Sequence, residues 1–406
     1  MVSPVHRWVR VSLFNLLIVA SLGVVLRYKI LFPLPFVDQK HLLHGHSHFA
    51  FAGWVSQAIM TLLVTYLSRQ SGEAVLKKYS WLLYGNLLTA YAMLIAFPIE
   101  GYGLYSILFS TASIFVSYAF AIYIWRDLNR LTQKTPTHLW IKAAVLFNAL
   151  SSLGAFALAI MMVKRIVFQN AYLAAEYFYL HFQYNGWFFF GCMALVSEVL
   201  RKVEVNTGSL TRIFWLFAFA AVPGYFLSAL WMNLPLWVYL LVVASSVAQV
   251  IGLVKLLLQL KHRWTLLKNT LSLTAKWIMG FSVIALVAKL LLQLGSTVPS
   301  LSDLAFGFRP IVIGYLHLVL LGVITLFLLG YFFAGEYIHA NKKTSFAVFL
   351  FAAGVIVNEL LLMIQGVSAM SYTSVPYINE LLLGTAFLLF SGAFLLFTTS
   401  AKFFKT

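Results

Sequence analysis

Long apolar runs recur along this chain, and their length constrains the fold more than any other feature. About twelve runs reach the ~20 residues that an α-helix needs to cross a bilayer. They lie at roughly 9–30, 42–68, 79–98, 103–125, 138–163, 174–199, 211–231, 235–260, 271–294, 309–335, 344–369 and 378–403. The connections between them are mostly short. The sequence therefore predicts an all-α polytopic membrane protein with about twelve transmembrane helices, which form a single transmembrane domain over residues 1–406.

The composition agrees with a chain that lipid surrounds. Hydrophobic residues make up 62% of the sequence and charged residues only 10%, whereas a soluble domain needs a polar surface. We therefore expect the lipid bilayer to be the main partner. The single cysteine, Cys192, lies in an apolar run and excludes an internal disulfide and a cysteine-based metal cluster. The sequence also contains no Gly-rich phosphate loop, which argues against an ATP-driven transporter.

The basic residues determine the expected orientation. A net charge of +17 is typical of nucleic-acid binding, but here the charges gather in short connections on alternate sides of successive runs. This is the pattern of cytoplasmic loops in membrane proteins. It excludes a nucleic-acid partner and predicts a bacterial inner membrane protein with both termini in the cytoplasm. The residues that define this side include Arg7, Arg10, Arg69, Lys77, Lys78, Arg126, Arg130, Lys134, Arg201, Lys202, Lys261, Arg263, Lys268, Lys342 and Lys343.

Three histidines stand within five residues at the beginning of the second run. His44, His46 and His48 belong to the stretch HGHSHFAFAGW. Ionisable side chains at membrane depth are expensive and usually functional, and imidazole is a common ligand of metals and of haem iron. On a helix, residues four apart share a face, so His44 and His48 point the same way and His46 points elsewhere.

Two further histidines lie at a comparable depth. His181 is on the sixth run and His317 is on the tenth. The second, sixth and tenth runs all cross from outside to inside in the expected topology. Taken singly, each of these histidines is more often a hydrogen-bonded core residue than a ligand. Together, their shared depth predicts that residues far apart in sequence contribute to one site in the outer half of the bilayer.

These runs and histidines resemble subunit I of the haem-copper oxidase and nitric oxide reductase superfamily. His44-Gly45 resembles the family's His-Gly on helix two, whose histidine is an axial ligand of the low-spin haem. GYLH, ending at His317, resembles the helix-ten element that supplies the other axial ligand. His181, with Asn185-Gly186 after it, resembles the helix-six element of the reductases. The resemblance thus implies haem b at His44 and His317, and copper or non-haem iron at His181.

The choice among the helix-two histidines stays open at this stage. Motif matching favours His44, whereas counting residues from the inner end of each helix at ~1.5 Å per residue favours His48. His46 is the third candidate, so we expect the cofactor-binding residues to be His317 with His44, or with His48 as the second choice.

Several departures separate this chain from an active oxidase. Tyr315 replaces the histidine that binds the high-spin haem, the seventh run has no histidine pair, and Asn185 replaces a carboxylate of the reductases. Divergent relatives of the NnrS type are therefore the closer analogue. The resemblance implies a haem-copper oxidase subunit I-like fold and a membrane b-type haem protein with a degenerate dinuclear centre. Its role would be electron transfer or a task linked to nitric oxide or oxygen, with a cytochrome or a quinol as electron donor.

Two alternatives remain at this stage. The chain can be an active terminal oxidase or nitric oxide reductase with an altered metal site, or a histidine-dependent carrier of metal ions or protons. No residue is assigned a catalytic role. We therefore expect a protein related to oxidoreductases, and both an active and an incomplete catalytic centre stay open.

Overall fold

The computed structural model describes residues 4–72, 74–302 and 308–400, and these are almost entirely helical, with no β-strand among them. Ten helices in this part of the chain are long and apolar enough to cross a membrane, which confirms an all-α polytopic membrane protein. They coincide with ten of the expected spans: Pro4–Leu31, Gln39–Ser71, Val75–Glu100, Leu104–Arg130, Pro136–Val163, Leu236–His262, Leu273–Gly295, Arg309–Ala334, Lys342–Met370 and Ile378–Ser400.

The two remaining expected spans are helical but differ from the other ten. At the sixth, α7 (Gln169–His181), η2 (Phe182–Phe188) and α8 (Phe189–Lys202) follow one another without a break. Histidine, glutamine and asparagine in the middle of this segment lower its hydropathy. At the seventh, α9 (Thr207–Ala221) is followed by the 3-10 helix η3 (Pro223–Ala229) at a bend of 46°. Proline lacks the main-chain N–H that would continue α9, which explains the break.

The chain divides into two compact units, each assembled from separate stretches of sequence. The first comprises Met1–Phe120, Leu271–Val283 and Leu316–Thr406, and the second comprises Ala121–Thr270 and Ile284–Tyr315. The helices of the first unit are α1 (Pro4–Leu31), α2 (Gln39–Phe49), η1 (Ala50–Ser56), α3 (Gln57–Ser71), α4 (Ala74–Glu100), η4 (Leu318–Thr325), α15 (Leu326–Ala334), α16 (Lys342–Met370) and α17 (Ile378–Ser400). The second contains α6 (Pro136–Val163), α7, η2, α8, α9, η3, α10 (Leu236–His262) and α11 (Trp264–Thr270). Three helices belong partly to each: α5 (Leu104–Arg130), α12 (Leu273–Gly295) and α14 (Arg309–His317). The expectation of a single domain stays a prediction.

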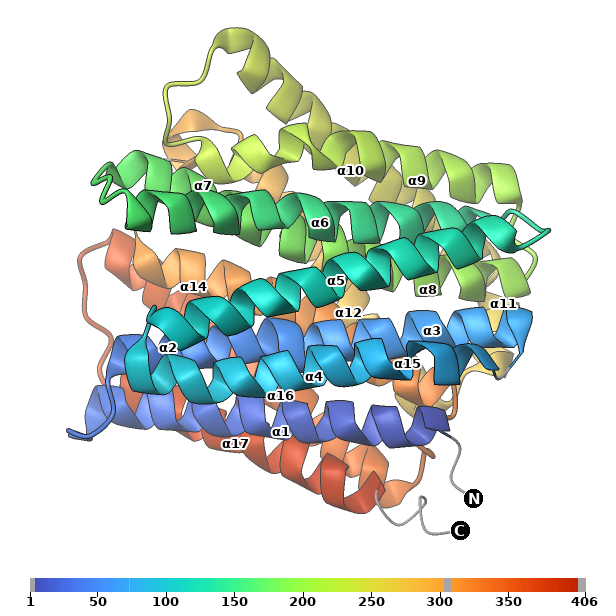
Figure 1. The fold of residues 1–406 in the computed structure, drawn as a ribbon, viewed down its shortest axis with the longest axis horizontal. Helices are drawn as coiled ribbons and strands as arrows, with labels where there is room; N and C mark the ends of the chain where they lie inside the picture. Colours follow the sequence, from blue (N-terminus) through green and yellow to red (C-terminus); the bar gives the residue numbers. More distant parts are fainter. Residues whose placement is uncertain (1–3, 73, 303–307, 401–406) are drawn as a thin grey trace. The chain divides into compact units, whose positions relative to one another are not determined.

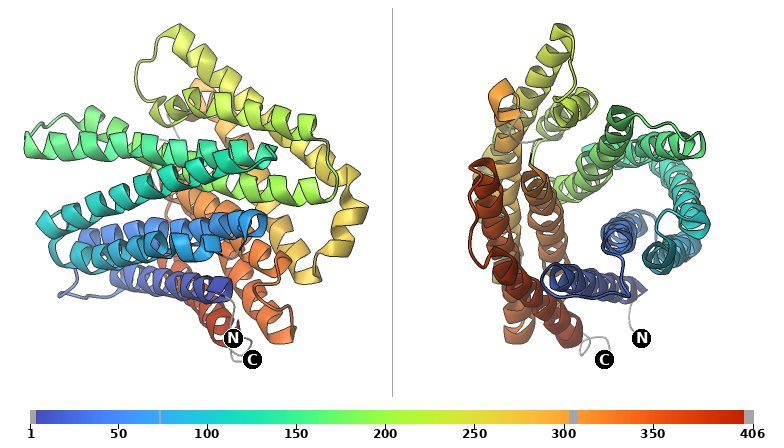
Figure 2. Two further views of the ribbon diagram at one scale, coloured as in Figure 1. Left: turned by 45° about the vertical axis from the view of Figure 1, so that its right-hand side comes forward. Right: turned by 90° about the vertical axis from the view of Figure 1, so that its left-hand side faces the viewer.

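In the first unit, α1 and α17 lie side by side, as Figures 1 and 2 show in blue and red. The guanidinium carbon of Arg10, near the beginning of α1, is 5.5 Å from the ring centre of Phe397, near the end of α17. At the same end of the unit, Arg69 donates a hydrogen bond of 2.8 Å to the Tyr337 hydroxyl, and the His6 ring lies 6.1 Å from the Tyr337 ring. The beginning of α1, the end of α3 and the segment after α15 therefore meet at one basic end.

Large apolar side chains face outward along the spans. Leu88 and Ile99 on α4 are 73% and 76% exposed, and Phe219 on α9 is 72% exposed. Such exposure is unfavourable in water and expected against lipid tails. The exposed apolar side chains thus agree with contact between the helices and a bilayer.

Candidate functional site

The histidine-bearing helix begins at a capped end and runs without interruption through α2, η1 and α3. The Asp38 carboxylate accepts a hydrogen bond of 2.8 Å from the main-chain N–H of His41, which caps the first turn of α2. The same hydrogen bond is the largest cause that lowers the pKa of Asp38. Gly45 lets α2 approach α4 closely, because a Cβ atom there would lie 2.9 Å from Cγ of Pro98.

His44 and His48 share a face of the helix, as their spacing predicts, and this face lies against the end of α4. The His48 ring stacks on Phe97 with 4.2 Å between ring centres and 12° between planes. The His44 ring lies 4.5 Å from the Tyr102 ring, and its Nε2 is buried without a hydrogen-bond partner. The two histidines predicted as alternative cofactor ligands thus share the same aromatic surroundings.

His46 faces the opposite way, towards α1 and His317. A Cβ atom on Gly23 of α1 would lie 3.8 Å from His46 Cε1, and the Val19 carbonyl is within hydrogen-bonding reach of the ring. Nδ1 of His46 is buried without a hydrogen-bond partner. The side chains of His46 and His317 interact electrostatically, whereas no such interaction joins His44 or His48 to His317. Of the three histidines on helix two, His46 is therefore the one that the structure brings to His317.

A hydrogen bond between the same two helices fixes their register. The indole Nε1 of Trp54 donates to the hydroxyl of Thr325 over 2.9 Å, and both residues are buried. Trp54 lies eight residues after His46, and Thr325 lies eight residues after His317. The two helices run in the same direction (Figure 1). This equal offset places His46 and His317 at a similar height along the two helices.

His181 lies in the second unit, at the end of α7, and both of its ring nitrogens are engaged. Nε2 is 2.8 Å from the Ala221 carbonyl, to which it donates, and Nδ1 is 3.1 Å from Nδ2 of Asn185, from which it accepts. A metal ion at His181 would have to replace one of these hydrogen bonds. Among the described residues, no group of three or more His, Cys, Asp or Glu side chains is arranged to hold a metal ion. The predicted metal role of His181 stays a prediction.

Tyr315, in α14, occupies the position at which the resemblance implies a second histidine on the tenth span. Its ring lies 6.3 Å from the ring of Tyr184, which is buried in η2 of the same unit.

Each of the three histidine-bearing helices contains a π-helical segment directly after its histidines: η1, η2 and η4. The π-helical segments were not predicted, but a spacing in the sequence marks all three of them. His48, His181 and His317 each stand five residues before a glycine, in HFAFAG, HFQYNG and HLVLLG. A π-helix inside a spanning helix is rare and frequent at functional sites. The shared element therefore singles out these three helices from the rest.

Side chains on neighbouring helices satisfy carbonyl groups of the π-helical segments in the first unit. Asn15 of α1 donates to the Gly53 carbonyl, and Asn86 of α4 donates to the Ala52 carbonyl over 3.0 Å. Ser282 of α12 donates to the Val323 carbonyl over 2.7 Å. Since lipid offers no hydrogen bonds, such donors stabilise an irregular helix in a membrane.

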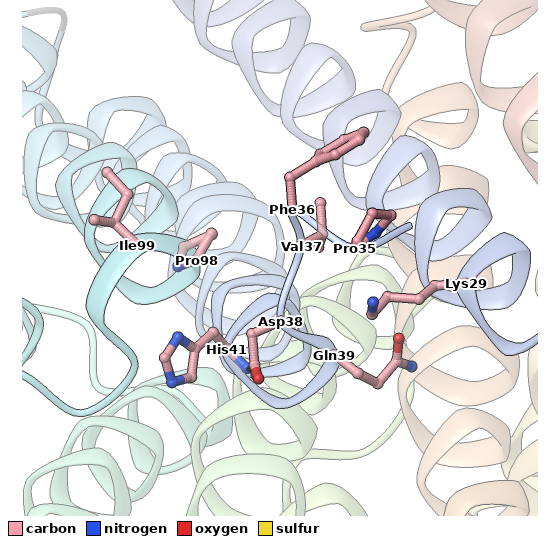
Figure 3. Close-up of a pocket in the computed structure, with 9 residues that line it drawn as sticks. All are labelled: Lys29, Pro35, Phe36, Val37, Asp38, Gln39, His41, Pro98 and Ile99. Atoms are coloured by element: carbon pink, nitrogen blue, oxygen red, sulfur yellow. Dashed lines mark hydrogen bonds between the residues drawn. The ribbon is translucent and has the colours of Figure 1, made fainter. Parts of the chain in front are cut away.

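A pocket of about 660 Å³ opens where α1 connects to α2, beside the end of α4 (Figure 3). It is lined by Lys29, Pro35, Phe36, Val37, Asp38, Gln39, His41, Pro98 and Ile99. These residues come from the connection between α1 and α2 and from the end of α4. The pocket therefore lies beside the beginning of the histidine-bearing helix, one turn before His44.

No protein-family model matches this chain, and no curated protein matches it in sequence.

Proposed function

We propose that this chain is an integral membrane b-type haem protein in which His46 and His317 would hold one haem. The observation that carries the proposal is the similar height of these two histidines on two spanning helices, which the Trp54–Thr325 hydrogen bond joins. It is supported by the buried Nδ1 of His46, which has no hydrogen-bond partner. An unsatisfied buried nitrogen costs about 1–3 kcal/mol, and a bond to iron would remove that cost.

The surroundings of His46 fit a metal ligand. Histidines that bind metals usually donate their other ring N–H to a carbonyl or carboxylate, which fixes the ring and its tautomer. The Val19 carbonyl is placed to accept such a bond from His46. Gly23 leaves room beside the ring, since any side chain there would contact Cε1. The chain has one cysteine, so it lacks the Cys pair that attaches a c-type haem.

Electron transfer is the role that two histidine ligands favour. When bound, the haem would supply reversible one-electron chemistry, and two imidazoles would leave its iron no open position for oxygen or nitric oxide. The protein would hold the two imidazoles in place and surround the group with apolar side chains. Tyr315 in place of a histidine, and the hydrogen bonds on His181, agree with a degenerate dinuclear centre.

The proposal includes a haem-copper oxidase subunit I-like fold of divergent, NnrS-like type. Counting α7–η2–α8 and the bent pair α9–η3 as spans brings the described helices to the twelve that such a fold requires. The basic end of the first unit, where α1 begins and α17 ends, supports a cytoplasmic location for both termini in a bacterial inner membrane. A cytochrome or a quinol is the proposed electron donor.

An optical spectrum of the purified protein tests this function. We expect a Soret band, a reduced-minus-oxidised difference spectrum of haem b, and a pyridine haemochromogen of the b type. Carbon monoxide should leave the reduced spectrum unchanged, because neither axial position is open. A preparation that contains no haem iron would refute the proposal, and a spectrum that carbon monoxide shifts would refute the pair of histidine ligands.

A further inference from the structure

We infer that Trp54 and Thr325 are positioning residues, whose hydrogen bond sets the register and rotation of the two helices that present His46 and His317 to the haem. The inference rests on the proposed function and extends it to residues that never touch the group. It starts from the bond of 2.9 Å between the Trp54 indole and the Thr325 hydroxyl. The two residues are 271 positions apart in the chain, so no local constraint brings them together.

The bond lies in the irregular part of each helix. Trp54 is in η1 and Thr325 ends η4, and both π-helical segments begin shortly after the histidines. The wider turn of a π-helix rotates the helical turns before it relative to the turns after it. The orientation of His46 and of His317 relative to each other therefore depends on how these two segments are held.

Buried side chains hold each segment from the sides as well. Asn15 is fully buried, donates to the Gly53 carbonyl and accepts a hydrogen bond of 2.8 Å from the Tyr91 hydroxyl. Asn86 donates both to the Ala52 carbonyl and, over 2.8 Å, to Oε1 of Gln57. These bonds fix η1 to α1 and α4, whereas the Trp54–Thr325 bond joins η1 to η4.

Substitutions that remove this bond while keeping the packing test its role. Trp54→Phe removes the N–H and keeps an aromatic ring, Thr325→Val removes the acceptor, and Thr325→Ser keeps it. Trp231→Phe is the matched control, because the Trp231 indole donates over 3.0 Å to the Ser228 carbonyl within one turn of the second unit. These four variants, and the double variant that combines Trp54→Phe with Thr325→Val, are purified with their haem.

The readouts are the electron paramagnetic resonance spectrum of the oxidised haem, which reports the relative orientation of two imidazole planes, and the rate of haem transfer to excess apomyoglobin. We expect Trp54→Phe and Thr325→Val to shift the low-spin signal and to accelerate haem transfer about tenfold, which is the effect of one hydrogen bond. The double variant should differ little from either single one, because both remove the same bond. Thr325→Ser and Trp231→Phe should resemble the unmodified protein.

The outcomes separate this inference from the proposed function. If the unmodified protein contains no haem, the proposed function fails. If it contains haem, and Trp54→Phe and Thr325→Val keep both the unshifted signal and the original transfer rate, the function stands and the positioning role is wrong. Accelerated transfer with an unshifted signal would show a purely structural contact and would also contradict the inference.

Discussion

Trp54 and Thr325 are joined by a buried hydrogen bond, and each lies eight residues after a histidine on its own helix. This relationship places His46 and His317 at a similar height on the two helices.

His181 should behave as a structural residue when it is replaced. In His181→Ala the Ala221 carbonyl loses the hydrogen bond of 2.8 Å that it accepts from His181. We therefore expect the free energy of unfolding to fall by about 1–3 kcal/mol. The haem content per protein should not change. Thermal unfolding in detergent, together with metal analysis of both proteins, checks this expectation. Loss of one copper or non-haem iron per chain in the variant would instead support the predicted metal site.

Replacing either of two glycines on α17 by alanine should change the stability of the protein in opposite directions. A Cβ atom on Gly392 would lie 2.6 Å from the main-chain nitrogen of Phe351 on α16, whereas nothing lies within 4 Å of one on Gly384. Gly392→Ala should therefore destabilise the protein by about 1–3 kcal/mol or more. Gly384→Ala should be neutral or stabilising by about 0.5–1 kcal/mol. Equal melting temperatures for the two variants would contradict the packing of α16 against α17.

Asp38 should make the stability of the first unit depend on pH. Its hydrogen bond to the His41 N–H lowers the pKa of the carboxyl group in the folded protein. The stabilisation is therefore present above the pKa of the unfolded chain and is lost as the pH falls through the lower, folded value. Asp38→Asn keeps an acceptor for the cap without the charge, so its melting temperature should fall less than that of the unmodified protein between pH 5 and pH 3. Parallel melting curves over that range would rule out this contribution of Asp38.

Hydropathy predicts ten of the spans because an apolar helix of spanning length has few alternatives in a membrane. It describes the segment around His181 and Asn185 poorly, since the polar residues that shape the π-helix η2 also lower the apolar signal. The bend before Pro223 is visible in the sequence as a proline, but its angle depends on packing.

The directions in which the three histidines of α2 point are only partly predictable from the sequence. The spacing of His44 and His48 predicts correctly that they share a face and that His46 points elsewhere. Which face meets His317 depends on how α2 is rotated, and the contacts of Gly45 with Pro98 and of Gly23 with His46 determine that rotation. These contacts join residues from different helices, which a single sequence does not pair.

The haem content of four alanine variants tests the central claim most directly: His46→Ala, His317→Ala, His44→Ala and His48→Ala, each purified alongside the unmodified protein. If His46 and His317 hold one haem, the first two variants lose its low-spin spectrum and the other two retain it. Full haem in His46→Ala, with loss in His44→Ala or His48→Ala, would contradict the account and return the ligand to the residues that the motif and the depth favoured.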